Sequence, residues 1–575
     1  MGQQSLITLD TDHIHGYVFE TNRLQEIRGA SSILDTLNRR AMFEIAEQEY
    51  GGQKVFANGG AGLFLIEGDA TRAEEYGQRI QREYRKQTNG GVSITYAVQE
   101  LPEGMDAWHE DSRIEREMLN YKLMQKKSAA PAVISLPSHP FLRPCSACGT
   151  RNAEYRDYSE ANDEVNDLAS QRDRYCSVCW SKRHEDDAIK RSIVTIVNEY
   201  RSTGTVDFEH NVTHGYAWAR MIGGLNREEY DIRVETERPP DFNELRGITG
   251  GKDYLALVYA DGNSMGQVFA GLKTLEDVRD TAKNIDTAVY KAMSEAVRRH
   301  LQVVPAEGKT PPRFPFDMLM MGGDDAIIVT PSPQALDVAC TLAKTFHEET
   351  QKFSLDGKGF TLSIGVVFAP VNYPFALLYA LAHDALKHAK KEGDSRKHLA
   401  SDYEKTYINF MSVTGSGSLS FKKVYKSLYN KHVQDGEREV AMYATLRPYT
   451  VEELEMLLEA IRKGRGKGLG RTKLHQVRDA VLKMNLTTSV YEGMAVLSNW
   501  QAKQRDFVME HVNILGKRYQ EPYYDEEKPS TLFQRVTFPW FGDGPKTYRT
   551  SLLDFVELYN FIEQGEEEEV RDNAN

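Results

Sequence analysis

Residues 317–329 read DMLMMGGDDAIIV, and the interpretation of the whole chain starts from this stretch. An apolar run leads into two glycines and two aspartates, and a second apolar run leads out. Short apolar runs bounded by turn residues are typical of β-strands, and Gly-Gly supplies the positive φ angles that a tight hairpin turn needs. The stretch therefore predicts a β-hairpin that carries Asp324 and Asp325 at its tip.

Two adjacent carboxylates on a mostly buried hairpin are unfavourable by themselves. The charges of Asp324 and Asp325 repel each other and lose solvation. A bound divalent cation is the simplest way to offset that cost. The alternative is an ordinary aspartate-rich surface turn.

A second stretch, residues 255–269, reads LALVYADGNSMGQVF and favours the metal interpretation. It predicts a buried strand that ends at Asp261, followed by a glycine-rich turn at Gly262 and Asn263 and then a helix. Backbone N–H groups at such a turn suit a phosphate. If the two strands are neighbours, Asp261 lies beside Asp324 and Asp325. Three carboxylates around one or two Mg²⁺ ions are the arrangement of nucleotidyl transfer.

Length and composition set the frame. For 575 residues, typical domain sizes predict about three to five domains. The net charge of −13 argues against a uniformly basic nucleic-acid-binding coat. No apolar run approaches the roughly 20 residues that span a bilayer. The first residues show no secretory signal, so we expect a cytoplasmic protein.

The order of elements around the hairpin occurs twice along the chain. Strands at 5–9 and 91–98 and helices at 22–48 and 71–87 enclose residues 58–66, which read NGGAGLFLI, a hairpin without acids. Three pairs of short matches support the repeat: Gly16-Tyr17-Val18-Phe19 with Gly266-Gln267-Val268-Phe269, Gly59-Gly60 with Gly322-Gly323, and Ser93-Ile94 with Ser363-Ile364. We infer two copies of one βαββαβ-like domain. Chance similarity between two unrelated α/β domains is the alternative.

The acids do not repeat. Counted from the shared Gly-x-Val-Phe, Thr11 falls opposite Asp261, although Asp10 and Asp12 flank it and a slip of one residue would restore a carboxylate. Ala61 and Gly62 fall opposite Asp324 and Asp325. The first copy is therefore predicted not to hold catalytic metal, but to pack against the second and complete its nucleotide pocket.

Four of the five cysteines form two Cys-x-x-Cys pairs, Cys145 with Cys148 and Cys176 with Cys179. Two such knuckles predict a tetrahedral Zn²⁺ site in which all four ligands are thiolates, so its role is structural. A redox pair is the alternative. Cys340 stands alone in an apolar helix and is interpreted as core packing.

The remaining features are more ambiguous. A helix at 374–391 carries Lys387 and Lys390, which either reach a triphosphate or only suit the helix dipole. His383-Asp384 on the same helix is interpreted as structural. Residues 401–575 are predicted to be mainly helical. The basic, glycine-rich residues 463–471 are either a phosphate-backbone contact or a solvated loop, and residues 566–569 belong to an acidic tail.

Taken together, four features resemble the large polymerase/cyclase subunit of type III CRISPR–Cas effector complexes, particularly the III-B (Cmr) branch. They are the opening Thr21 to Ser31 (TNRLQEIRGAS), the acid-free Gly-Gly hairpin, the Cys₄ knuckle pair between the copies, and Gly-Gly-Asp-Asp in the second copy. Residues 363–367 (SIGVV) and the helical C-terminal region are also similar.

The resemblance implies an α+β multidomain protein with two ferredoxin-like palm domains of the nucleotide-cyclase type, a Cys₄ zinc-binding insertion and a helical C-terminal domain. It implies synthesis of a cyclic oligoadenylate-type second messenger from ATP when a foreign RNA pairs with the guide RNA. Asp261, Asp324 and Asp325 match the catalytic acids that hold two Mg²⁺ or Mn²⁺ ions. The residues placed around the nucleotide are Gly262, Asn263, Gly322, Gly323, Ser363, Lys387 and Lys390.

The predicted boundaries are 1–127 for the acid-free first palm-like domain, 128–250 for the linker and zinc-binding domain, 251–405 for the catalytic palm and 406–575 for the C-terminal domain. Many members begin with an HD nuclease domain, and none is expected here. The expected partners are other subunits of the complex, guide RNA and target RNA, with no membrane. A stand-alone cyclic nucleotide synthase and a catalytically idle RNA-binding scaffold are the alternatives.

Overall fold

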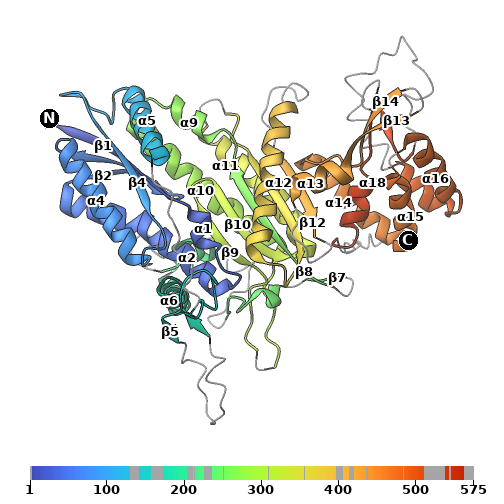
Figure 1. Ribbon diagram of the computed structural model, residues 1–575, viewed down its shortest axis with the longest axis horizontal. Coiled ribbons are helices and arrows are strands. Elements are labelled where there is room, and N and C mark those ends of the chain that lie inside the picture. Colours follow the sequence, from blue (N-terminus) through green and yellow to red (C-terminus); the bar gives the residue numbers. More distant parts are fainter. Residues whose placement is uncertain are drawn as a thin grey trace, which may run out of the picture.

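In the computed structural model the chain is elongated, with the N-terminal elements at one end and the C-terminal helices at the other (Figure 1). The structure describes residues 3–562, except for 130–140, 157–172, 204–211, 226–235, 397–405, 414–419, 511–537 and shorter gaps at 213, 224, 246, 250–251, 309, 355–356, 436–437, 484 and 543–545. Most of the predicted linker, part of the zinc-binding segment and the acidic tail lie outside the described residues.

The first sheet has the strand order β2-β3-β1-β4 and is antiparallel throughout. Its strands are β1 (Gln4–Thr11), β2 (Gln53–Asn58), β3 (Ala61–Glu67) and β4 (Ile94–Glu100). Between β1 and β2 lie α1 (Ile14–Val18), α2 (Leu24–Thr36), a π-helical turn (Leu37–Ala41) and α3 (Met42–Tyr50). Helices α4 (Ala70–Gln87) and α5 (Arg113–Ala129) precede and follow β4.

The second sheet repeats this order as β9-β10-β8-β11 and then continues into β12 and β15. The repeated strands are β8 (Lys252–Gly262), β9 (Asp317–Gly322), β10 (Asp325–Pro331) and β11 (Leu362–Pro370), and β7 (Gly247–Thr249) pairs with β8. Helices α9 (Met265–Gly271) and α10 (Leu275–His300) connect β8 to β9, α11 (Ala335–Gln351) connects β10 to β11, and α12 (Phe375–Arg396) follows β11. The two sheets therefore share one βαββαβ connectivity.

Strand β11 shows why the second sheet is buried on both faces. Eight of its nine residues are buried, as expected for a central strand covered by helices on either side. At Gly365 a Cβ atom would lie 2.2 Å from the carbonyl oxygen of Ala382, so only glycine lets α12 pack directly onto the strand. This close packing fixes the helix that reaches the acid-bearing edge of the sheet.

The two sheets share an apolar core. Buried side chains of the first sheet, such as Leu9 and Phe64, belong to the same cluster as Leu257, Tyr259 and Val329 of the second. The predicted packing of the first copy against the second is present in this arrangement.

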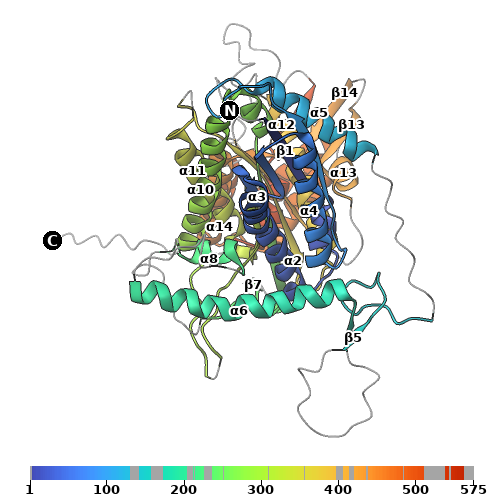
Figure 2. The same cartoon turned by 90° about the vertical axis from the view of Figure 1, so that its left-hand side faces the viewer.

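A long helix, α6 (Ser177–Thr203), runs across the base of both sheets beneath α2 and α8 (Tyr216–Gly223) (Figure 2). It crosses α2 in backbone contact, because a Cβ atom at Gly29 would lie 1.7 Å from the carbonyl oxygen of Lys182. The side chain of Lys182 is fully buried and donates hydrogen bonds to the Tyr17 carbonyl and the Glu20 carboxylate, both at 2.6 Å. The Cys-bearing segment is thereby anchored on the first sheet's helices.

The C-terminal region differs from the helical prediction for residues 406–575. Helices α14 (Val451–Gly466), α15 (Arg471–Leu482), α16 (Leu486–Ser498) and α18 (Leu552–Leu558) are present. However, β12 (Tyr407–Ser412) and β15 (Tyr449–Thr450) extend the second sheet, so that sheet runs past the predicted boundary at 405. A separate four-stranded sheet has the order β13-β14-β17-β16, with strands Asn430–Asp435, Arg438–Tyr443, Thr547–Arg549 and Phe541–Gly542. Alternating polar and apolar residues, such as His432 and Val433 of β13, do not by themselves clearly predict a strand.

The basic segment at 463–471 is only partly a loop. Helix α14 continues through Gly466, and Arg465 turns inward to bond the Tyr559 carbonyl and stack on its ring.

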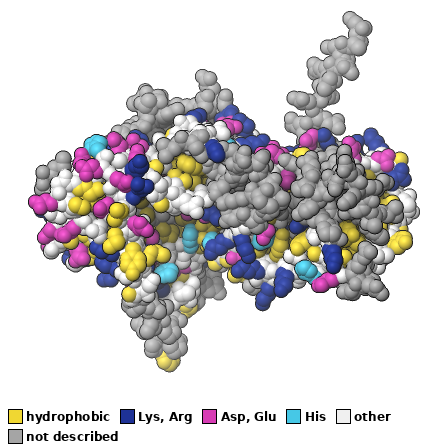
Figure 3. Space-filling model, turned by 90° about the horizontal axis from the view of Figure 1, so that it is seen from above, with side chains coloured by type: hydrophobic (Ala, Val, Ile, Leu, Met, Phe, Trp, Pro, Cys, Tyr) yellow, Lys and Arg dark blue, Asp and Glu magenta, His cyan; other side chains and the backbone are white. Residues whose placement is uncertain are grey.

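Seen from above, acidic and basic side chains lie interspersed at the N-terminal end of the molecule (Figure 3). In the described residues no helix is both long enough and apolar enough to cross a bilayer.

Candidate active site

Three carboxylates meet at one edge of the second sheet. Asp261 ends β8 and Asp325 begins β10, and the register that pairs Ala260 with Ala326 sets these two acids opposite each other on neighbouring antiparallel strands. Asp324 lies in the two-residue hairpin turn, and its Oδ2 would be 2.5 Å from a Cβ atom built at Gly262. The structure thus brings together the three acids that the sequence singled out.

The electrostatics of this cluster favour a bound cation. Burial, followed by the charge of Asp261, raises the pKa of Asp324 to about 6. The same two causes raise the pKa of Asp325 well above its usual value. Asp325 Oδ1 is buried and makes no hydrogen bond within the described part of the chain. A divalent cation would remove the repulsion and give this oxygen a partner, so the donor set fits Mg²⁺ or Mn²⁺.

One lysine lies on the acids. Lys390 of α12 bonds Asp261 Oδ2 at 2.5 Å and the Gly262 carbonyl at 2.9 Å. The other predicted lysine, Lys387, is exposed on the same helix. Lys390 therefore lies on the acid cluster itself, and its contact with a triphosphate stays a prediction.

The turn after β8 is organised differently from the prediction. The Gly262 N–H donates to the Asp324 carboxylate, and the Asn263 N–H donates to the Thr361 carbonyl at 2.9 Å. Both N–H groups thus have acceptors within the protein, and the role of this turn in phosphate binding stays a prediction. Ser363 donates to Asn263 Oδ1 at 2.7 Å, so Ser363 and Asn263 brace each other beside the acids.

The two glycines of the hairpin have different roles. Gly323 alone has a positive φ, 64°, at the first position of the turn. Gly322 closes the strand and permits a close approach, since a Cβ atom there would lie 3.1 Å from the Gly59 backbone nitrogen. The acid-free hairpin of the first sheet therefore touches the acid-bearing hairpin of the second, tip to tip.

The first sheet repeats the local geometry with a register that differs by one from the prediction. Asp10 pairs with Ala61, the first residue after the hairpin turn of the first sheet, just as Asp261 lies opposite Asp325, the first residue after the turn of the second. On its other side Asp10 pairs with Thr95, as Asp261 pairs with Ser363. Asp10, not Thr11, therefore corresponds to Asp261. Gly60 and Ala61, not Ala61 and Gly62, then correspond to Asp324 and Asp325. The error came from the Gly-x-Val-Phe match, because Gly16 is the third residue of α1 whereas Gly266 is the second residue of α9.

Further details repeat with the strands. Lys127 of α5 bonds Asp10 at 2.5 Å, as Lys390 bonds Asp261. His13 and Ser264 both have left-handed backbone, at φ 53° and 57°, immediately before the first helix of each copy. Non-glycine residues rarely adopt this conformation, so its recurrence supports a common origin for the two sheets.

The sequence reasoning missed a pair of histidines. His15 of α1 and His383 of α12 face each other with ring centroids 6.5 Å apart, against Tyr259 and Tyr379. Burial, followed by the nearby His383, lowers the pKa of His15 to about 4, while Asp261 acts in the opposite direction. Tyr379, His383 and Lys390 follow one face of α12 at helical spacing, and that pattern could have indicated the site.

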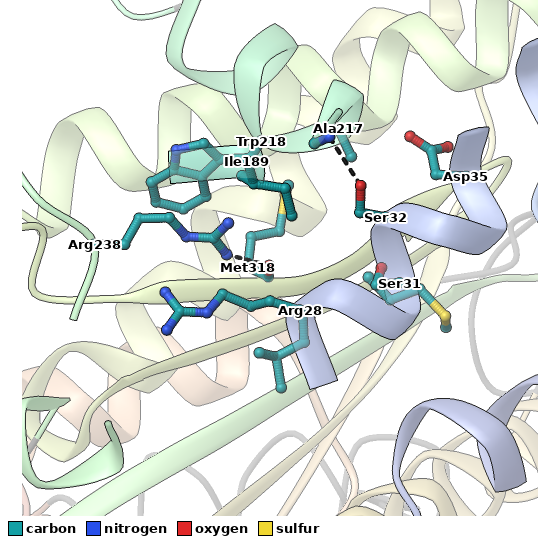
Figure 4. Close-up of a pocket in the computed structure, with 12 residues that line it drawn as sticks. Arg28, Ser31, Ser32, Asp35, Ile189, Ala217, Trp218, Arg238 and Met318 are labelled. Atoms are coloured by element: carbon teal, nitrogen blue, oxygen red, sulfur yellow. Dashed lines mark hydrogen bonds between the residues drawn. The ribbon is translucent and has the colours of Figure 1, made fainter. Parts of the chain in front are cut away.

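Strand β9 is also fixed at its far end. The buried Asp317 contacts Arg28 of α2 at 3.4 Å and forms an ion pair with Arg238. Arg28 and Arg238 extend into one pocket beneath Trp218 (Figure 4). Arg28 also contacts Asp186 of α6 at 3.2 Å, which connects the hairpin strand to the Cys-bearing helix.

The four predicted cysteines converge. Their Sγ atoms all lie within 4.8 Å of one another, and three of the four side chains are buried: Cys145, Cys148, Cys176 and Cys179, of which Cys148 is the partly exposed one. Four converging thiols fit a tetrahedral metal site with no open position. Cys340 is buried in α11, consistent with packing.

Comparison with known proteins bears on the acid-bearing sheet. Residues 254–400 match the family model described as Cas10/Cmr2, second palm domain. This segment is therefore similar to the second palm domain of Cas10/Cmr2 proteins. The curated Cmr2 subunit of the CRISPR system Cmr from Pyrococcus furiosus is 28% identical over 194 residues, which cover 30% of this chain and 21% of that protein. The match thus takes in about a fifth of the relative's length.

Among solved structures, Csm1 in T. onnurineus aligns at 13% identity over 97% of this chain and 70% of its own, with a TM-score of 0.49. A Csm1–Csm4 cassette crystallised with cA4 aligns at 15% identity over 85% of this chain and 64% of its own, also with a TM-score of 0.49. Both TM-scores are below 0.5, so the similarity to Cas10/Cmr2 proteins depends on the match at 254–400.

Proposed function

We propose that this chain is the palm-domain subunit of a type III CRISPR effector complex and makes a cyclic oligoadenylate-type second messenger from ATP. The observation that carries the proposal is the convergence of Asp261, Asp324 and Asp325, with a buried oxygen lacking a hydrogen bond, inside the segment matched to the Cas10/Cmr2 palm. The matched relative is a subunit of a CRISPR Cmr system, which supports the biological setting.

Each residue then has a definite task. Asp261, Asp324 and Asp325 hold the cations, and Mg²⁺ or Mn²⁺, when bound, activates a ribose hydroxyl and stabilises the pyrophosphate leaving group. Lys390 bonds Asp261, and its ammonium group would be available to the triphosphate if a cation were held by that carboxylate instead. Lys387, exposed on the same helix, adds positive charge for the same ligand. No general base is required among the side chains at this edge.

The first sheet, residues 1–127, serves as a palm whose hairpin lacks acids and that completes the nucleotide pocket. Its support is the tip-to-tip hairpin contact and the position of His15 opposite His383. Ser363 and Asn263 keep the turn beside the acids in place. Residues 128–250 carry a structural Zn²⁺ on the four cysteines. The catalytic palm begins near 251, and the region after it contacts guide RNA, target RNA and partner subunits.

The test is conversion of ATP with Mg²⁺ or Mn²⁺, with products identified by mass spectrometry. The protein alone is compared with its complex containing target RNA, and with the double variant Asp324→Ala/Asp325→Ala. Asp280→Ala is the matched control, because that carboxylate is on the surface of α10 in a pair with Arg279.

We expect product that depends on target RNA and is absent in the double variant. Product without any RNA would instead identify a stand-alone synthase. No product under any condition, with RNA binding intact, would refute the enzyme and leave a scaffold subunit.

A further inference from the structure

A buried carboxylate lies directly behind the acid-bearing turn. Asp286, in the middle of α10, is 5% exposed. Its Oδ1 accepts a hydrogen bond from the Gly323 N–H at 3.3 Å and from Arg39 Nη2 at 2.9 Å. Its Oδ2 accepts from Arg220 Nη1 at 2.5 Å and from Arg39 Nη1 at 3.4 Å. Asp286 thus links the turn to two arginines from other parts of the chain.

These arginines keep Asp286 ionised. Burial by itself would raise the pKa of this carboxyl, but Arg39 and Arg220 outweigh it and the pKa is lowered. The guanidinium of Arg220 lies 4.0 Å from the ring centre of Tyr290, and that of Arg39 lies 4.8 Å from the ring of Tyr216. The arginines are therefore held in place by aromatic rings as well as by charge.

The turn needs such support. It consists of Gly323 and Asp324 alone, and it holds Asp324 and Asp325 close to Asp261 although their charges repel. The Gly323 N–H is its contact with α10, while the Gly322 backbone lies against Gly59 on the opposite side. A shift of the turn away from Asp286 would separate the carboxylates.

We propose that Asp286 is a positioning residue that sets the spacing of the three acids. Because Arg39 comes from the helical segment after α2, the same contact makes the acid geometry depend on the first sheet. This inference rests on the proposed role of the acids as metal ligands.

The substitution Asp286→Asn tests it with little change in volume. The asparagine side chain has one acceptor oxygen, whereas both carboxylate oxygens of Asp286 accept hydrogen bonds. In either amide orientation, an NH₂ group faces the Gly323 N–H or the guanidinium of Arg220, so one donor loses its partner. Either the turn loses its own hydrogen bond, or the side chain that holds the turn loses its bond to Arg220. Changes in the partners of metal ligands typically reduce metal affinity by about 10- to 100-fold.

The primary measurement is Mn²⁺ binding by electron paramagnetic resonance, on full-length protein without ATP. We expect the Mn²⁺ Kd of Asp286→Asn to rise roughly 10-fold with the number of sites unchanged. A merely structural role would instead lower the number of sites, because part of the protein would be misfolded, without changing the Kd. The Mn²⁺ concentration for half-maximal ATP turnover should rise by the same factor.

Asp35→Asn is the matched control. Asp35 is partly buried and bonds Arg39 Nε at 2.7 Å, but within the described part of the chain it makes no hydrogen bond to the turn. We expect its Mn²⁺ Kd to stay within about twofold of the wild-type value. An unchanged Kd in Asp286→Asn, or an equal rise in Asp35→Asn, would overturn the inference.

Two further arms keep the test decisive. If Asp286→Asn does not fold, Arg220→Gln removes the partner of Oδ2 and should still raise the Kd several-fold, whereas an unchanged Kd would overturn the inference. Asp325→Ala should abolish Mn²⁺ binding. If binding survives in Asp325→Ala, the acids are not the metal site, and the proposed function fails together with this inference.

Discussion

Replacing Asp324 by asparagine should stabilise the metal-free protein while removing its metal site. Asp324 is partly buried, and the adjacent Asp261 and Asp325 are like charges. Asparagine keeps the shape and an oxygen that can accept the Gly262 N–H, but it carries no charge. The gain should therefore depend on pH and should disappear when a cation neutralises the wild-type site.

The magnitude follows from the pKa of Asp324, which rises from 3.8 to about 6 in the folded protein. Each pKa unit corresponds to about 1.4 kcal/mol, so ionising Asp324 costs the folded state about 3 kcal/mol at most. Because the pKa of Asp324 is higher in the folded than in the unfolded protein, the wild type does not pay this cost below pH 4. It loses about 3 kcal/mol of its free energy of unfolding as the pH rises through about 6. The variant does not suffer that loss.

The assay is chemical denaturation with chelator present, at pH 4 and at pH 8, comparing wild type with Asp324→Asn. We expect the variant to be more stable by about 1–3 kcal/mol at pH 8 and equal to wild type at pH 4. Added Mn²⁺ should stabilise the wild type alone. If the variant is less stable by the same amount at both pH values, then repulsion among the three carboxylates does not destabilise the folded wild type, and the reasoning is refuted.

Three further predictions follow from other parts of the molecule. Cys148→Ser should reduce bound zinc, measured by mass spectrometry of the metal content, and lower the melting temperature, and a zinc chelator should reproduce both effects on the wild type. Gly29→Ala should destabilise by roughly 2 kcal/mol or more in denaturation experiments because it forces apart two helices in backbone contact, whereas Gly271→Ala, whose Cβ meets open space, should change little. With a pKa lowered from 6.5 to about 4, His15 should cost the wild type stability as the pH falls through that window, and His15→Gln should remove that part of the pH dependence, measured by thermal unfolding.

The sequence predicted the parts of the fold that local pattern determines. The apolar runs around Gly322 and Asp324 specify the hairpin, and the order of strands in both copies could be read from where such runs recur. The knuckle spacing of the cysteines correctly predicted their convergence. These features depend on neighbours in the chain, so a single sequence contains the information.

What the sequence could not provide depends on contacts between distant segments. The role of Asp286 is invisible in the sequence because its partners Arg39 and Arg220 lie on other helices. The same holds for the pairing of His15 with His383. The register of the first sheet was wrong by one residue, since the matched Gly16 and Gly266 hold different positions in their helices. Strands β12 and β15 were missed because they join a sheet formed by earlier residues.

The contact between Gly59 and Gly322 has a consequence for how the molecule is made. The first hairpin leaves the ribosome well before the second, and the acid-bearing turn reaches its final surroundings only when the two tips meet. Contacts between residues so distant in sequence form late and slowly. Metal binding at Asp325 would then report completion of folding, since an intermediate with only one sheet formed lacks the backing that Arg39 and Gly59 supply.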